Sequence, residues 1–325
     1  MPHTIAQRVR EWSTKLDGVN YVEIHKHIEY LSQNIFKDYG PTVGPHPAFT
    51  TRLKLWLDSA SDQADQRLLF QLVQYVLFYG WLEFAALYRA AFEGPVKRWV
   101  IDLAAIDIAD PNCAGAIRQE LRKTWFCPIT DSMAIAAFCH ANRISGRDFR
   151  PDWTSLSKFG DADKLERFMQ KEGIARVVLL EDFVGSGSQM SKAIMFAGTL
   201  ASRIPVLVVP LIVCPGGVRT GRRLASLYPT VTFSPVVEIA SRGFVGNADP
   251  HPLLFGEILK LAERLHPTVV ADPAHDPQSK PYGPLGWGDT GSTVVLHSNC
   301  PDNSLPLFHH SSSSWSALFP RSSRI

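Results

Sequence analysis

The chain has 325 residues, of which 45% are hydrophobic and 20% charged, and its formal net charge is +2. This composition is typical of a globular protein with enough length for one large core or two smaller ones. The near-neutral charge excludes bulk affinity for nucleic acid or a membrane surface. The scattered cysteines form no CxxC pair, and the apolar runs are far shorter than the roughly 20 residues of a membrane span, so we expect a cytoplasmic protein with reduced thiols and no membrane contact.

The first third of the chain has helical patterning. Residues 62–78 start with Asp62, a residue that can cap a helix, and continue with apolar side chains at helical spacing. Residues 81–92 and 95–105 predict two further helices, the second with a proline in its first turn. We therefore expect a helical region over residues 1–110.

From about residue 123 short apolar runs alternate with helical patterns. The expected strands are 124–129, 177–180, 205–214 and 231–239, and the expected helices are 131–143, 189–201 and 218–228. This alternation predicts an α/β fold with a parallel sheet flanked by helices. The fourth strand contains a proline, which favours an edge position. Ligands bind beyond the carboxyl ends of strands in such sheets.

The last part of the chain, beyond about residue 265, is rich in Pro, Gly, Ser and His. It contains one expected strand, 293–297, and regularly spaced bulky apolar residues. This spacing indicates a segment that packs against the body of the protein. We therefore assign residues 111–325 to an α/β domain with a C-terminal extension.

The most informative stretch is VVLLEDFVGSGSQ, residues 177–189, a strand followed by two acids and a small-residue turn. A P-loop would need Gly-Lys-Ser/Thr, which is absent. Residues 182–188 are similar to the DPFxGSGT methyl-donor loop of amino-methylating DNA methyltransferases. The proline after the acid is missing, however, and no [DNS]PP[YFW] element occurs. A plain strand-to-helix turn stays open, although two adjacent acids are more than a cap requires.

A ribose-phosphate cradle fits the same residues. The carboxylates of Glu181 and Asp182 can accept hydrogen bonds from the two vicinal hydroxyls of a ribose. Backbone N–H groups at the start of the following helix can face a 5′-phosphate. The phosphate-binding residues would then be the members of the turn, Gly185, Ser186, Gly187, Ser188 and Gln189.

The chain resembles the phosphoribosyltransferase-like (PRTase-CE) family of bacterial conflict and anti-phage defence loci, which includes retron-associated members. The resemblance is strongest at LLEDFVGSGSQM and extends to PITDSMA (128–134), to GPLGWGDTGSTVVLHSNCPDNSLPLF (283–308) and to WSALFPR (315–321). It implies a type I phosphoribosyltransferase fold and phosphoribosyl diphosphate as donor, with Glu181 and Asp182 as catalytic residues. It also implies a reverse transcriptase and its nucleic acid as a partner in some loci.

The resemblance also implies a pyrophosphate loop and a metal. The loop would be Thr130 to Met133, with Asp131 and Ser132 as binding residues, although Asp131 can equally cap the next helix. Mg²⁺ would bridge the pyrophosphate and the ribose hydroxyls, so that Glu181 and Asp182 act on it only indirectly. The transition state is expected to be oxocarbenium-like, and the protein would stabilise it by positioning the reacting groups and by neutralising charge.

Several positions depart from the family pattern or stay ambiguous. Glu181 replaces the commoner Asp, and Gly185 and Gln189 replace residues with hydroxyl groups. Two functions therefore stay open, an active transferase and a module that only binds a phosphorylated ribose or nucleotide. Ambiguous positions are Arg219, Arg222 and Arg223 (phosphate clamp or solvated face), His297, His309 and His310 (base, metal ligand or neither), and Asn299, Asp302 and Asn303 (site lining or turn).

Overall fold

A computed structural model describes residues 4–41, 46–145, 153, 161–200, 204–271 and 283–322. The chain forms two compact units. Unit 1 combines Met1–Leu82 with Ser241–Ile325, and unit 2 is Glu83–Ala240. The boundary expected at residue 110 falls inside unit 2, and as a division into domains it stays a prediction. No described helix is long and apolar enough to cross a membrane.

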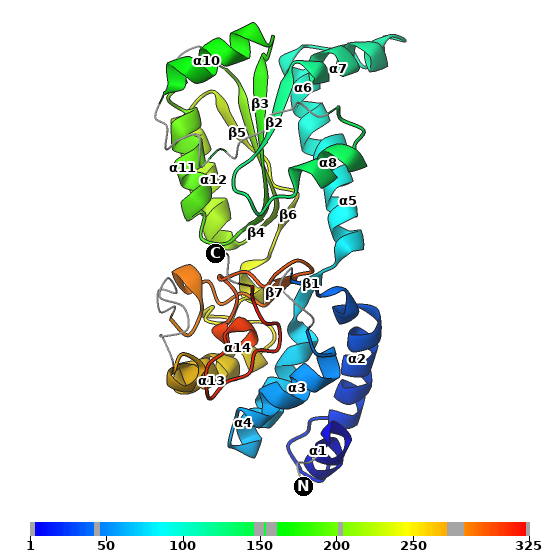
Figure 1. Cartoon of the computed structure of the whole chain (residues 1–325), viewed down its shortest axis with the longest axis vertical. Coiled ribbons are helices and arrows are strands. Elements are labelled where there is room, and N and C mark those ends of the chain that lie inside the picture. The colour runs from blue at the N-terminus through cyan, green and yellow to red at the C-terminus, as the bar shows by residue number, and fades with distance from the viewer. Residues whose placement is uncertain are drawn as a thin grey trace. The chain divides into compact units, whose positions relative to one another are not determined.

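Unit 2 is built on a parallel five-stranded sheet, which confirms the predicted fold class. Strands β2 (Thr124–Pro128), β3 (Arg176–Val184), β4 (Val206–Val213) and β5 (Val231–Phe233) lie in this order, and β6 (Val237–Glu238) also pairs with β4. All of these pairs are parallel. Figure 1 shows helices on both sides of this sheet. They are α5 (Trp81–Ala91), α6 (Lys97–Leu103), α7 (Cys113–Arg122), α8 (Ile135–Ala141), α10 (Ala162–Lys171), α11 (Ser188–Ala197) and α12 (Pro215–Leu227).

The two faces of this sheet are buried by different helices. Strand side chains alternate between faces, and Val177 and Leu179 belong to a core with apolar residues of α10, α11 and α12. On β2, Phe126 packs against Phe92 and Phe138, which lie next to α5 and in α8. Burial on both faces explains why β3 and β4 are nearly continuous apolar runs instead of alternating ones.

Several expected elements of unit 2 differ in extent from the structure. The strand expected at 231–239 is split into β5 and β6 at the edge of the sheet, because Pro235 between them has no N–H to donate. The helix expected at 131–143 is only α8, Ile135–Ala141. Helix α11 starts at Ser188, and residue 201, its expected last residue, lies outside the described residues.

Unit 1 packs helices from both ends of the chain around one core. Apolar residues of the N-terminal helices share this core with Ile258 and Leu261 of α13 and with Leu307, Phe308 and Phe319 near the C-terminus. The expected packing of the C-terminal segment is thus confirmed for its described part, which excludes 272–282. The elements are α1 (Ile5–Trp12), α2 (Tyr21–Asn34), α3 (Phe49–Asp58), α4 (Gln63–Leu72), β1 (Leu77–Tyr79), α13 (Leu254–Val269), β7 (Val294–Leu296) and α14 (Pro306–His309).

A two-stranded parallel sheet also joins the two ends of the chain in unit 1. The strand expected at 293–297 is β7, and its partner is β1. Asp62 caps α4 as expected, since its carboxylate accepts from the N–H of Ala64 at 2.6 Å. The helix expected at 62–78, however, ends at Leu72, and the prediction missed β1. The apolar spacing of residues 73–78 fits a helix, but only Val73–Tyr75 continue as a short 3-10 helix, and pairing with β7 makes Leu77–Tyr79 a strand.

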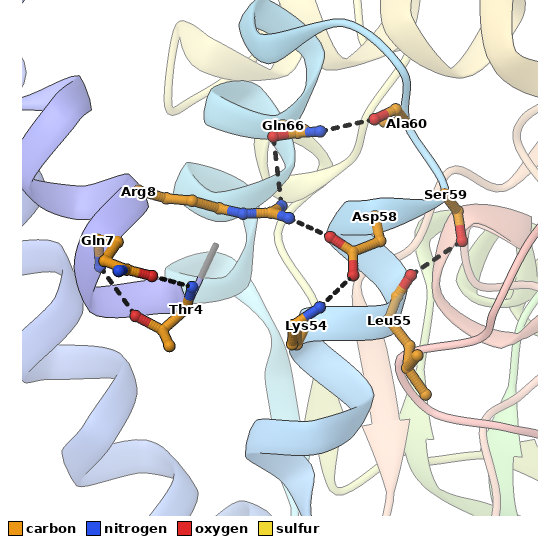
Figure 2. Close-up of polar contacts among 9 residues, drawn as sticks. All are labelled: Thr4, Gln7, Arg8, Lys54, Leu55, Asp58, Ser59, Ala60 and Gln66. Atoms are coloured by element: carbon orange, nitrogen blue, oxygen red, sulfur yellow. Dashed lines mark hydrogen bonds and ion pairs between the residues drawn. The ribbon is translucent and has the colours of Figure 1, made fainter. Parts of the chain in front are cut away.

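Polar contacts attach α1 to the neighbouring helices of unit 1 (Figure 2). The guanidinium of Arg8 donates to the carboxylate of Asp58 on α3 and, at 3.3 Å, to the side chain of Gln66 on α4. Lys54 also donates to Asp58, at 2.5 Å. Burial raises the pKa of Asp58, but the bonds from Lys54 and Arg8 outweigh it and hold the pKa below its usual value.

Candidate functional site

The carboxyl ends of β2 and β3 bring two distant stretches of sequence together. In the parallel register Pro128 lies opposite Leu180, and the N–H of Ile129 donates to the carbonyl of Leu180 at 2.7 Å. β2 ends at Pro128, and Thr130 follows two positions later, beside the acid pair of β3. The acids therefore lie within β3, and the strand continues beyond the Val177–Leu180 stretch that the sequence predicted.

Glu181 is held by Thr130. Its Oε2 accepts from the backbone N–H of Thr130 at 3.0 Å, and its Oε1 lies 2.6 Å from the Thr130 hydroxyl. The residue is only 3% exposed. Burial raises the pKa of Glu181 well above its usual value, and the charges of Asp182 and Asp131 raise it further, against the bonds from Thr130 that lower it. Both carboxylate oxygens of Glu181 thus bond Thr130, at the start of the 130–133 loop.

Asp182 has a different set of neighbours. Its Oδ1 accepts from the Ser132 hydroxyl at 3.0 Å and from the N–H of Phe183 at 2.7 Å. Strand alternation puts it on the face that α5 and α8 cover. Tyr88 of α5 is buried and packs against Phe138 of α8, and burial together with the charge of Asp182 raises the pKa of Tyr88 to about 12. Nothing in the sequence indicated Tyr88.

Two members of the loop after β2 contact the acid pair, and the residue between them is exposed. Ser132 is half-buried and bonds Asp182 as described, whereas Asp131 is exposed. The capping role considered for Asp131 is wrong, because α8 begins at Ile135 and its N-cap residue is Ala134. Thr130 is the residue whose contribution the sequence did not reveal, since it depends on a contact across 51 positions.

The turn after β3 is shaped by glycines. Gly187 has φ +86°, a left-handed conformation that favours glycine, and it is the N-cap residue of α11. The carbonyl of Gly185 accepts from the N–H of Gly217 at 2.9 Å, and the Thr220 hydroxyl donates to the carbonyl of Ser186 at 3.4 Å. The turn is therefore braced by the first turns of α12. The N–H groups at the start of α11 have no partner within the helix and can bind an anion.

The remaining candidates of unit 2 line the outside of this turn. The hydroxyls of Ser186 and Ser188 lie 3.4 Å apart, and Ser188 and Gln189 are exposed in the first turn of α11. Arg219 is exposed on α12, one position before Thr220. Arg222 forms an ion pair with Glu238 at 2.7 Å, which makes it part of a solvated face. A role in binding stays a prediction for each of these residues.

The histidine and asparagine candidates lie in unit 1. His309 is buried, and its Nε2 donates to the carbonyl of Ser304 at 3.2 Å. Burial and, to a smaller extent, the charge of Arg321 lower the pKa of His309 to about 3. The Asn303 amide donates to the carbonyl of Trp287 at 2.8 Å, and Asn299 bonds the backbone of Ser322. These asparagines fix turns of unit 1.

Binding of a magnesium ion at this site would require a bound substrate that supplies phosphate oxygens. Within the described ranges, no group of three or more His, Cys, Asp or Glu side chains could hold a metal ion. Mg²⁺ keeps waters and commonly binds through one or two carboxylates and the phosphates of a substrate. The acids present fit such an indirect arrangement, in which the oxygens of a bound donor hold most of the coordination shell.

Comparison with known proteins agrees with this architecture. A family model described as PRTase-CE matches residues 53–321, which contain all of unit 2 and most of the described part of unit 1. No curated protein and no solved structure matches the chain.

Proposed function

Because the chain belongs to the PRTase-CE family, we propose that it binds phosphoribosyl diphosphate at the carboxyl ends of β2 and β3. There it transfers the phosphoribosyl group to an acceptor, or hydrolyses the donor, as an effector of a bacterial anti-phage defence system. One observation carries the proposal: the Asp182 carboxylate and the Ser132 loop adjoin at the end of the sheet, next to a glycine turn that opens α11.

Each group has a defined task in this reaction. Asp182 accepts hydrogen bonds from the ribose hydroxyls, and the turn of Ser186, Gly187 and Ser188 donates to the 5′-phosphate. In the 130–133 loop, the backbone N–H of Ser132 donates to the pyrophosphate, while the Ser132 hydroxyl donates to Asp182. Mg²⁺, when bound with the donor, neutralises phosphate charge. The bond between ribose C1 and the pyrophosphate oxygen breaks, C1 bonds the acceptor oxygen or nitrogen, pyrophosphate leaves with the electron pair, and the proton of the acceptor passes to solvent water.

The test is release of pyrophosphate from phosphoribosyl diphosphate by the purified protein with Mg²⁺, alone and with partner proteins encoded in the same locus. We expect Asp182→Ala and Glu181→Ala to abolish release while the circular dichroism spectrum stays native. Asp163→Ala, which removes an exposed acid in the first turn of α10, is the matched control and keeps the wild-type rate. Absence of release under every condition overturns the transfer reaction.

A binding module is the second candidate, and a specific observation favours it. Both oxygens of Glu181 are taken up by Thr130, so Asp182 is left as the acid that meets a ribose. Gly185 and Gln189 also lack the hydroxyls typical of catalytic members. In this case the unit senses a phosphorylated ribose or nucleotide and passes the signal to a partner such as a reverse transcriptase. Calorimetry separates the two: tight binding without turnover supports the module, and no binding of donor or nucleotides excludes it.

A further inference from the structure

Four side-chain oxygens form a continuous chain through the candidate site. They run from Glu181 Oε1 to Thr130 Oγ1, then to Ser132 Oγ, and end at Asp182 Oδ1. The three separations are 2.6, 2.8 and 3.0 Å, all within hydrogen-bond distance. Each of these contacts needs one proton between its two oxygens, because two oxygens at such distances repel when only lone pairs face each other.

The protons in this chain can be counted. A hydroxyl carries one proton, so Thr130 and Ser132 supply two protons for three contacts. An ionised carboxylate supplies none. If both acids were ionised, one contact would therefore have no proton, whichever way the hydroxyls turned. The third proton must come from one of the two carboxyl groups, and a second carboxyl proton would find no place in the chain.

The surroundings decide which acid keeps the proton. Glu181 is 3% exposed and lies near the charges of Asp182 and Asp131, conditions that favour its neutral form. Asp182 Oδ1 accepts a second bond from the N–H of Phe183, which favours the ionised form of that acid. Tyr88, which faces Asp182 from α5, is a neutral phenol at neutral pH.

We propose that Glu181 and Asp182 share one proton through Thr130 and Ser132, so that the acid pair carries a single negative charge, on Asp182. Glu181 then donates to Thr130, Thr130 donates to Ser132, and Ser132 donates to Asp182. Glu181, Thr130 and Ser132 are positioning residues that aim the Asp182 carboxylate and fix the pyrophosphate loop. The effect on donor binding rests on the function proposed above, whereas the proton count does not.

Infrared spectroscopy of the full chain without donor tests the proton count. With carbon-13 in the glutamate side-chain carboxyl groups, we expect a protonated-carboxyl C=O band at neutral pH that shifts on labelling and disappears in Glu181→Gln. Glu263→Gln, at an exposed position of α13, keeps the band. Absence of the band in the labelled wild type overturns the proposal, as does a band that shifts only when aspartate is labelled. The wild-type spectra decide even if Glu181→Gln does not fold.

A conservative pair of variants tests the positioning role. Thr130→Val removes the middle hydroxyl but keeps the backbone N–H and a similar shape, whereas Thr130→Ser keeps the hydroxyl. We expect Thr130→Val to weaken Mg²⁺-dependent binding of phosphoribosyl diphosphate about tenfold, a typical effect of one lost buried hydrogen bond, and Thr130→Ser to restore it. Equal affinities in the two variants, with matching melting temperatures, overturn the role of the hydroxyl. Failure of the wild type to bind the donor tells against the proposed function and leaves the infrared result standing.

Discussion

At the end of β3, two adjacent acids meet different surroundings. The side chain of Glu181 points to a threonine that takes up both of its oxygens, and that of Asp182 points to a serine, a backbone N–H and a buried tyrosine. Their spacing in the sequence makes them look equivalent. The structure instead makes Glu181 part of the support for the loop, and by our proposal the negative charge of the pair lies on Asp182.

Gly187 is the residue of the turn that tolerates change least. A Cβ at this position would lie 3.0 Å from Thr220 Cβ and 3.3 Å from Gly217 Cα, in a left-handed conformation that costs other residues about 1–2 kcal/mol. We expect Gly187→Ala to lower the free energy of unfolding by at least that amount and to weaken donor binding. Gly115→Ala is the control, because a Cβ there meets nothing within 4 Å and alanine favours the helix. Urea denaturation and calorimetry measure the two effects, and equal behaviour of both variants would refute the argument.

His309 makes the stability of unit 1 dependent on pH. Its pKa in the folded state is about 3, against about 6.5 in the unfolded chain. Between these two pH values the imidazole is protonated in the unfolded chain but neutral in the folded chain. The free energy of unfolding therefore keeps its full value above pH 6.5 and decreases as the pH drops toward 3. The loss by pH 3 is on the order of 4–5 kcal/mol.

The matching variant is His309→Gln, whose amide can still donate to the carbonyl of Ser304. We expect its unfolding free energy to fall less steeply than that of the wild type over this range. His27→Gln, at an exposed position of α2, should follow the wild-type curve. Chemical denaturation at a series of pH values tests this, and parallel curves for His309→Gln and the wild type would show that His309 does not carry the effect.

At the scale of elements, Arg8 gives α1 a polar attachment to its neighbours. Arg8 connects it to α3 and α4 through Asp58 and Gln66. We expect Arg8→Met, which keeps the apolar stem, to lower the free energy of unfolding by about 1 kcal/mol, because Asp58 is partly exposed and keeps Lys54. Lys26→Met, which breaks an exposed pair with Glu23, should change it by less than about 0.5 kcal/mol. Urea denaturation measures both, and a similar small change in each would contradict the attachment.

The elements that the sequence predicted best are those whose local pattern and tertiary role agree. The apolar runs at β3 and β4 are typical of strands buried on both faces, and Asp62 marks the start of α4. The sequence did not reveal β1, because its pairing with β7 joins residues more than 200 positions apart. The contact between Thr130 and Glu181 was hidden for the same reason: the acid pair and the turn are local patterns, while their partners depend on the register of the sheet.

At the scale of the whole molecule, each unit has its own core. Unit 2 is continuous in sequence and closes around its sheet, whereas unit 1 is assembled from both ends of the chain. The sequence pattern alone does not reveal this assembly, because the core partners of the N-terminal helices follow more than 150 residues later. The block that resembles the family at the C-terminus contributes core residues and turns to unit 1, in addition to any role at the site.

Deletion of the chain from residue 297 onward tests this assembly of unit 1 from both ends of the chain. The missing segment buries six large apolar side chains, each worth about 1.5–3 kcal/mol: Leu305, Leu307, Phe308, Trp315, Leu318 and Phe319. In addition, the Leu307 carbonyl accepts a hydrogen bond from the indole N–H of Trp56 at 2.6 Å. The sum is as large as the whole stability of a typical domain, so we expect unit 1 to unfold and unit 2 to persist. Hydrogen exchange would then show lost protection in α3 and α4 and retained protection in β3 and β4.

The fragment 83–240 serves as the control and should show the same protected strands. Protection that survives in α3 and α4 of the truncated chain would mean that the N-terminal helices form a core without the C-terminal segment.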